Sequence, residues 1–358
     1  MARICFANCG FSQCGKGAII SGGKLIAVKM RFMNTGIRSS MVHRTAVAAP
    51  RRLQHRVCRW ALVLLALAAG ALSSPSVFAA PPSEPWPVAL RVQMAKLTTV
   101  GYRLNLAAVD LCSSKAAGTG MSLDYIGAYS ESDRPAVSQL LSMNDKPQIA
   151  AVVKGGPADL AGVRVGDELL AVNGETAGAI IAASPDAALI ADEIEQRLAQ
   201  QPVAKVIQLG LRRDGNAFEV HIQPQLTCAA RFVIKTGEGI TAFSDGSNVA
   251  ISSKLIAFAV NDDELALVAG HELGHVIYHD GTAGSLAERR RMEDRADSVG
   301  LRLATCAGFD PSTGLEFWLR RDEQDMLRLF RDPSHRSRKA RVQLMRDEIP
   351  NIQCPYRP

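Results

Sequence analysis

The first 79 residues contain no aspartate or glutamate, although they carry eleven of the 41 lysines and arginines. The rest of the chain holds 30 basic and 35 acidic residues, a net charge of −5, so the overall charge of +6 describes the leader rather than the remaining protein. A basic face is what nucleic-acid binding requires. The net negative charge of the remaining protein removes the main argument for nucleic acid as a partner, so we expect none.

The apolar run at residues 61–72 has only 12 residues, whereas a membrane-spanning helix needs roughly 20. It follows an arginine-rich segment and precedes a stretch that ends at Ala79. That order is typical of a secretory signal peptide cut after Ala79. We therefore expect residues 1–79 to be removed and the protein to be periplasmic, with membrane association peripheral at most. The alternatives are an uncleaved signal that anchors the chain in the inner membrane, and a true start at Met41.

Four of the eight cysteines fall in this predicted leader. An even number in an exported chain favours disulfide bonds, and four cysteines allow three connectivities. Cys112 and Cys228 stand before and after a small module described below, and the termini of a domain often lie close together. We predict the pairs Cys112–Cys228 and Cys306–Cys354.

The motif His271-Glu-Leu-Gly-His275 carries the strongest chemical signal in the chain. Histidines four residues apart on a helix project from one face, which lets both imidazoles bind one zinc ion. Glu272 lies about 100° further round the helix, within reach of a water on the open side of the metal. Asn261, with Glu264 three residues later, is a good helix start. The sequence thus predicts a zinc site with Glu272 as the catalytic base.

A catalytic zinc site needs a third protein ligand, usually a carboxylate. The next predicted helix, residues 285–304, carries Glu293 and Asp297 one turn apart. Together with HELGH and residues 307–311 (Ala-Gly-Phe-Asp-Pro), this pattern resembles the HtpX/BepA-type zinc metallopeptidases, which are gluzincins. The resemblance implies that Glu293 is the third ligand and that Asp297 orients a ligating histidine. Arg295 departs from the family pattern, in which an acid is common.

A segment upstream of the motif resembles the strand that precedes the zinc helix in this family. The resemblance implies that an extended substrate aligns along the edge of that strand, which favours unfolded polypeptides over folded ones. The predicted substrate strand consists of Ile240, Thr241, Ala242, Phe243 and Ser244.

Residues 155–174, with Pro-Ala-x-x-Ala-Gly and Gly-Asp-x-Leu followed by Asn-Gly, are similar to the core of a bacterial PDZ domain. A helix that ends near Gln200 and a hairpin over residues 206–222 complete the module. On that resemblance residues 125–129 form the open strand that receives a peptide, with Tyr125, Ile126 and Gly127 in the groove. The alternative is a PDZ domain that packs on the protease as a spacer.

The arginine-rich run at residues 336–341 is typical of a solvated helix face. Family members often carry a His-Pro pair near this point, and Asp332 occupies the histidine position here. His335, three residues later, is a candidate for an oxyanion-stabilising or gating role. A solvated histidine at a helix start is the alternative.

We therefore predict an α+β fold. Residues 80–117 are a linker and N-terminal helix, residues 118–226 a small β-barrel-like PDZ domain, and residues 227–358 a mostly helical metallopeptidase domain with a short edge-strand sheet. The predicted protein is an endopeptidase that binds one zinc ion (Zn²⁺) and cleaves unfolded or misassembled polypeptides. The resemblance implies a role in envelope protein quality control, with envelope assembly machinery as a further partner. A periplasmic chaperone or adaptor without catalysis is the alternative.

Overall fold

A computed structural model describes residues 20–21, 24–25, 84–237, 239–324 and 334–356. The described residues from Glu84 onward belong to one compact unit, and a short antiparallel pair of strands, β1 (Ile20–Ser21) and β2 (Lys24–Leu25), lies in a second. The predicted cleavage site lies outside the described residues. No helix in the described part of the chain combines the length and the apolarity that a membrane crossing requires.

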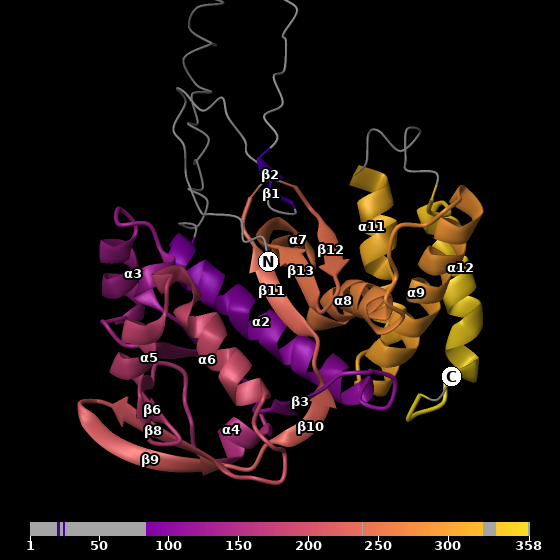
Figure 1. Cartoon of the computed structure of the whole chain (residues 1–358). Coiled ribbons are helices and arrows are strands. Elements are labelled where there is room, and N and C mark those ends of the chain that lie inside the picture. The colour runs from indigo at the N-terminus through magenta and orange to yellow at the C-terminus, as the bar shows by residue number, and fades with distance from the viewer. Residues whose placement is uncertain (1–19, 22–23, 26–83, 238, 325–333, 357–358) are drawn as a thin grey trace, which may run out of the picture. The chain divides into compact units, whose positions relative to one another are not determined.

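The long helix α2 (Trp86–Ala107) contacts elements from both predicted domains of the main unit (Figure 1). Near its start, Arg91 donates hydrogen bonds to Asp124 and Gln148, at 3.1 Å in each case. Near its end, the Arg103 guanidinium donates to the carbonyl oxygen of Ala307 at 2.9 Å. Leu97 and Leu104 are buried in the same apolar core as the helix that carries the HELGH motif. The predicted N-terminal helix is therefore a core element and not only a connection.

The PDZ segment contains a six-stranded antiparallel sheet in the order β4-β5-β6-β8-β9, with β7 paired to β6. The sheet is open at β4 and β9, so the predicted barrel-like form is an open sheet. Its strands are β4 (Met121–Asp124), β5 (Gln148–Val152), β6 (Glu168–Val172), β7 (Glu175–Thr176), β8 (Ile207–Arg213) and β9 (Asn216–Ile222). Its helices are η1 (Ile126–Ala128), α3 (Arg134–Leu141), α4 (Pro157–Leu160), α5 (Ala177–Ala183), η2 (Ala187–Leu189) and α6 (Ile190–Ala199).

The chain enters and leaves this segment through one pair of strands. β3 (Lys115–Gly118) pairs antiparallel with β10 (Gln225–Cys228). Directly beside this pair the structure joins Cys112 to Cys228, with the two Cα atoms 5.5 Å apart. It also joins Cys306 to Cys354, with the Cα atoms 5.3 Å apart. These are the two pairs that the sequence analysis predicts.

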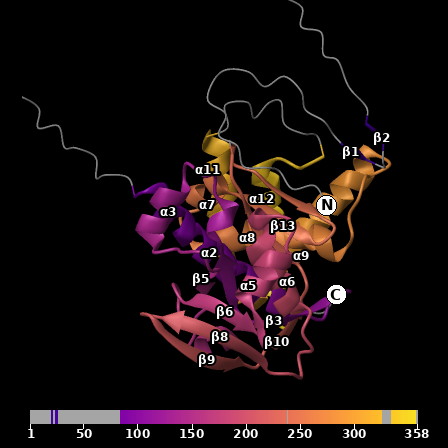
Figure 2. The ribbon, with the colours of Figure 1, turned by 60° about the vertical axis from the view of Figure 1, so that its left-hand side comes forward.

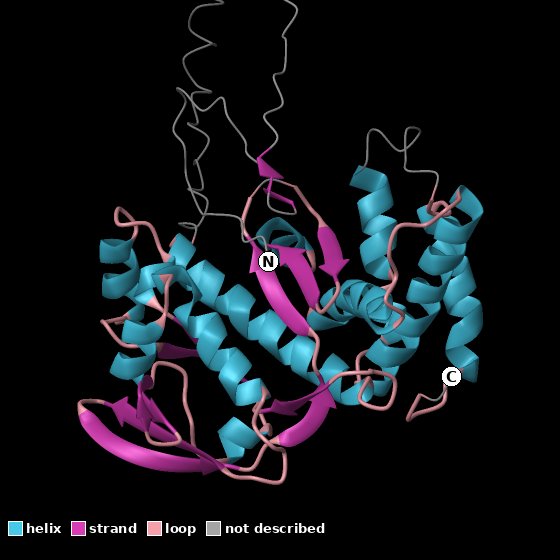
Figure 3. Cartoon of the chain, viewed as in Figure 1, coloured by secondary structure: helices cyan, strands magenta, loops and turns pink. Residues whose placement is uncertain are grey.

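The metallopeptidase segment combines a small sheet with packed helices (Figures 2 and 3). β13 (Asn248–Ser252) is the central strand, parallel to β11 (Arg231–Lys235) and antiparallel to β12 (Ala242–Asp245), so β12 is an edge strand. The helices are α7 (Ser253–Phe258), α8 (Asp262–Ile277), α9 (Leu286–Cys306), α10 (Pro311–Gly314), α11 (Glu316–Gln324), α12 (Arg338–Glu348) and η4 (Ile349–Asn351).

Helix α8 begins as its sequence predicts, because Glu264 N donates to the side chain of Asn261 at 2.9 Å. Its apolar residues Leu265, Ala269 and Leu273 lie in the core, and the opposite face is covered as well. His271 is only 6% exposed, since α9 packs against that face. The helix is thus buried on its apolar face and on the face that carries His271.

Candidate functional site

Two helices cross with their backbones in direct contact at the site. A Cβ atom added to Gly300 of α9 would lie 2.5 Å from the backbone N of His271 in α8, and one added to Gly270 would lie 2.8 Å from Gly300 O. Only glycine permits this approach. Glu293 lies two turns before Gly300 on α9, so the close crossing brings its carboxylate to the two histidines of α8.

The three predicted ligand residues converge on one small space. His271 Nε2 lies 3.2 Å from His275 Nε2, and Glu293 Oε2 lies 3.3 Å from the first and 3.5 Å from the second. Zinc bonds of 2.0–2.1 Å in tetrahedral geometry would separate ligand atoms by roughly 3.3 Å. Glu293 Oε2 is also buried, and the polar groups that contact it among the described residues are histidine nitrogens. The donor set and its spacing fit a zinc ion.

Each of the two histidines has a carboxylate behind it. Asp297 Oδ1 lies 2.8 Å from His271 Nδ1, in agreement with the predicted orienting role of Asp297. Asp280 Oδ2 lies 2.9 Å from His275 Nδ1. A carboxylate accepts hydrogen bonds, so both contacts favour the tautomer with hydrogen on Nδ1 and a free lone pair on Nε2.

In the metal-free protein the ligand residues are charged and form ion pairs with one another. Burial raises the pKa of Glu293, but hydrogen bonds from His271, His275 and His335 outweigh it and lower that pKa well below the usual range. Burial lowers the pKa of His271, but its bonds to Asp297 and Glu293 raise it to about 9. In the metal-free protein at neutral pH, His271 is therefore protonated beside the ionised Glu293 and Asp297, so the site favours positive charge.

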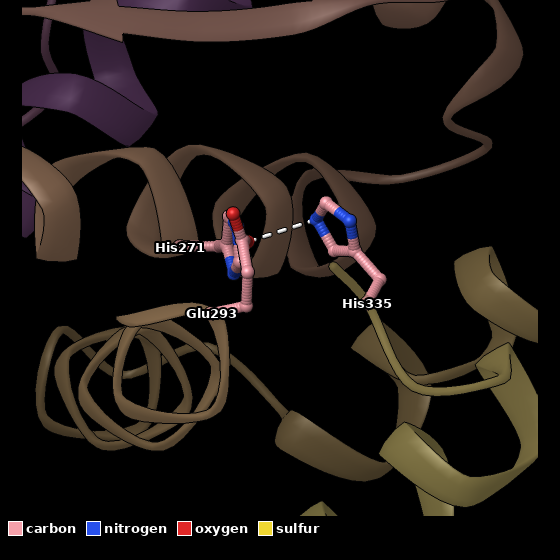
Figure 4. Close-up of side chains that lie close together, drawn as sticks. All are labelled: His271, Glu293 and His335. Atoms are coloured by element: carbon pink, nitrogen blue, oxygen red, sulfur yellow. Dashed lines mark ion pairs between the residues drawn. The ribbon is translucent and has the colours of Figure 1, made fainter. Parts of the chain in front are cut away.

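His335 also lies at this centre, as Figure 4 shows, with Nε2 2.8 Å from Glu293 Oε2. His271, Glu293 and His335 each offer a ligand atom, and these atoms lie within 4.8 Å of one another. The Nδ1 atom of His335 lies 3.0 Å from Ser334 Oγ. The histidine therefore belongs to this cluster of possible ligands, with its side chain 36% exposed. Asp332, the position compared with the family histidine, lies outside the described residues.

A cleft of about 110 Å³ opens beside His275. Its walls are Ser244 and Gly246 from the β12 end, and Val276, His279 and Asp280 from the end of α8. The edge strand β12 therefore borders the space next to the histidines. Of the predicted substrate residues, Ala242–Ser244 lie in β12, while Ile240 and Thr241 precede it.

Glu272 is half-buried on α8, one residue after His271. It belongs to the same helical turn as the two histidines, and it is not one of the buried residues of that helix. The residue therefore keeps part of its surface exposed beside the two histidines.

The predicted peptide groove of the PDZ segment is wrong in its secondary structure. Tyr125 is 9% exposed and lies in the apolar core, and η1 (Ile126–Ala128) is a 3-10 helix that includes Gly127. The Asp124 carboxylate stabilises this 3-10 helix, because it accepts hydrogen bonds from Tyr125 N at 2.8 Å and from Tyr129 Oη at 2.7 Å. These residues offer no extended strand edge to a peptide.

Two residues of the site escape the sequence analysis. Arg341 was expected on a solvated face, but it is 5% exposed, and its Nε donates to Asp297 Oδ2 at 2.7 Å. Asp280, which holds His275, lies in a turn without any motif. The signal that could have found Arg341 is the apolar pair Val342 and Met345 beside it, which places that side of α12 in the core.

Comparison with known families bears out both predicted modules. The family model of the PDZ domain matches residues 148–185, and that of Peptidase family M48 matches residues 220–286. The chain therefore carries a PDZ domain followed by a domain of Peptidase family M48, which is a family of metallopeptidases. No curated protein matches the sequence.

Solved structures share only local likeness with this chain. The HtrA-type protease AlgW with a decapeptide has 17% identity and a TM-score of 0.24, covering 31% of this chain and 30% of its own. The HtrA3 PDZ domain bound to a phage-derived ligand has 16% identity and a TM-score of 0.24, covering 32% and 89%. The serine endoprotease from Yersinia pestis has 23% identity and a TM-score of 0.18, covering 30% of each chain.

Proposed function

We propose that this chain is a zinc-dependent endopeptidase of the bacterial envelope that cleaves unfolded or misassembled proteins. The observation that carries the proposal is the convergence of three ligand atoms, from His271, His275 and Glu293, at mutual distances of 3.2–3.5 Å. Three protein ligands leave one position open, which is typical of catalytic rather than structural zinc sites.

The two histidines and Glu293 would hold the ion. When bound, zinc lowers the pKa of water toward about 7 and polarises a carbonyl group. Glu272 then accepts the proton of the attacking water and returns it to the leaving amine. His335, with its Nε2 2.8 Å from Glu293 Oε2, is placed to stabilise developing negative charge or to gate access.

The substrate would add to β12 as an extended strand. Ser252 N donates to Thr241 O at 2.9 Å, so Thr241 points its backbone groups toward β13. Antiparallel pairing alternates, and the backbone groups of Ala242 and Ser244 therefore face the free edge beside the cleft. An edge of this kind selects segments without stable structure. The PDZ domain would aid recognition or regulation of that cleavage, and envelope assembly machinery is a proposed partner.

The leader composition supports export to the periplasm. N-terminal sequencing of the envelope protein is expected to begin near Ala80. An intact chain that stays in membranes after carbonate washing would instead support the uncleaved anchor.

The test measures bound zinc and casein cleavage in the wild type and in Glu272→Gln. We expect about one zinc in both proteins and a loss of at least ~10²-fold in rate in the variant, the usual effect of losing a general base. Zinc-loaded wild type that binds casein without cutting it would favour the chaperone or adaptor. A variant with near-full activity would refute Glu272 as the base.

A further inference from the structure

The end of α8 folds back onto its own last turn. Asp280 N donates to His275 O at 3.0 Å, and His279 N donates to Val276 O at 3.2 Å. His279 has a φ of 52°, the left-handed conformation that favours glycine and costs other residues roughly 1 kcal/mol or more. A strained turn persists where its surroundings require it. Here it returns the Asp280 carboxylate to within 2.9 Å of His275 Nδ1.

Asp280 is itself held on its second oxygen. Arg295 of α9 donates from Nη2 to Asp280 Oδ1, while Oδ2 faces His275. The Asp280 side chain is only 7% exposed, and the Arg295 guanidinium lies 4.4 Å from the centroid of the Tyr278 ring. The carboxylate therefore has one fixed orientation, with each oxygen committed to one partner.

The same arrangement stands behind the other histidine. Asp297 contacts His271 Nδ1 with Oδ1, and Arg341 binds that carboxylate. The Arg341 guanidinium lies 4.0 Å from the centroid of the Trp318 ring. Each histidine thus has its own carboxylate, its own arginine and an aromatic ring beneath the arginine. The resemblance assigns an orienting role to Asp297 alone.

We infer that Asp280, fixed by Arg295, is the positioning residue of His275 and sets the affinity of the site for zinc. The inference rests on the proposed zinc site. It explains why Arg295 stands at a position where an acid is common in the family: here it binds the carboxylate that orients the second histidine. Carboxylates behind ligating histidines usually contribute about 10- to 100-fold in metal affinity.

The experiment measures the zinc dissociation constant of the exported protein by competition with a chromogenic chelator. We compare wild type with Asp280→Ala, Asp280→Asn, Arg295→Met and Asp347→Ala; Asp347 is an exposed carboxylate on α12 and serves as the control. Asp280→Ala should weaken binding by about 10- to 100-fold, and Arg295→Met by a smaller factor in the same direction. Asp347→Ala should leave the constant unchanged.

A second readout separates positioning from a purely structural role. The visible spectrum of the cobalt-substituted protein reports ligand geometry, and it should change in Asp280→Asn, which keeps the size of the side chain, with the metal-free protein still folded by circular dichroism. An unchanged zinc constant and an unchanged cobalt spectrum in Asp280→Asn and Asp280→Ala would overturn the inference. If the wild type itself binds no zinc, the proposed function fails instead.

Discussion

Two of the edge strands in the described part of the chain, β12 and β4, have four residues each but lie in different surroundings. β12 of the peptidase domain borders the cleft beside His275. β4 of the PDZ domain also ends its sheet, but its Leu123 N donates to the Glu195 carboxylate of α6 at 2.7 Å. The β12 edge borders the cleft of the candidate site, whereas the β4 edge is bound by a side chain of its own domain.

The difference shows that an edge strand alone does not make a peptide-binding site. β4 is tied further by α2, because Thr98 Oγ1 donates to Ser122 Oγ at 3.0 Å and Arg91 pairs with Asp124. β-augmentation needs free backbone groups. The comparison therefore favours the β12 edge of the peptidase domain, rather than β4, as the strand to which the proposed substrate would add.

The largest effect is expected from Gly300→Ala, which should disrupt the candidate metal site beside β12 in the peptidase domain. The new Cβ would lie 2.5 Å from His271 N and 2.7 Å from Gly270 C, so α8 and α9 must separate. Overpacking of this kind costs about 1–3 kcal/mol, and a shift of the ligands by about 1 Å costs on the order of 10²-fold in rate. Zinc content, casein turnover and urea unfolding measure these effects.

Gly281→Ala is the matched control, because a Cβ there meets nothing within 4 Å. It should keep its zinc and its rate. Full zinc occupancy and full turnover in Gly300→Ala would show that the helices need not approach so closely to form the site.

The zinc motif could be predicted because helix periodicity alone places His271 and His275 on one face. Asp280 could not be predicted, since its contact depends on the left-handed His279 that turns the chain back. The PDZ groove failed for a similar reason. The resemblance implies an extended strand at residues 125–129, but Asp124 binds Tyr125 and Tyr129 locally and pairs with Arg91 of α2, and a 3-10 helix forms there instead.

A smaller effect is expected from Ser244→Pro in β12. The Ser244 amide faces the free edge, where proline is tolerated, so stability should change little. The substrate loses one backbone hydrogen bond of about 0.5–1.5 kcal/mol, which predicts a rise in KM of roughly 2- to 10-fold with a nearly constant kcat. Steady-state kinetics on an unstructured reporter peptide measure both constants.

Phe243→Pro sharpens this test, because the Phe243 amide faces β13 and its loss breaks the ladder. That variant should lose stability clearly more than Ser244→Pro. Equal kinetic effects of the two prolines would mean that the free edge of β12 does not carry the substrate.

On the PDZ side, Glu195→Gln is expected to change only the pH dependence of stability, and not catalysis. Burial raises the pKa of Glu195 to about 7, with the charge of Asp192 acting in the same direction, although the bond from Leu123 N and the charge of Arg231 oppose the shift. A glutamate in the unfolded chain titrates near 4.3. The folded protein thus holds this proton more tightly than the unfolded chain, which stabilises the folded protein at low pH, and this contribution disappears as the pH rises through about 7.

The Glu195→Gln variant isolates this contribution, because glutamine keeps an acceptor for Leu123 N and cannot ionise. Relative to Glu195→Gln, the wild type should therefore lose roughly 2.5 kcal/mol of unfolding free energy between pH 5 and pH 8, as measured by urea titration at each pH. The histidines titrate in both proteins and cancel in the difference. Parallel pH curves would mean that Glu195 is not confined at the β4 edge, and the contrast between the two edge strands would then lose its PDZ half.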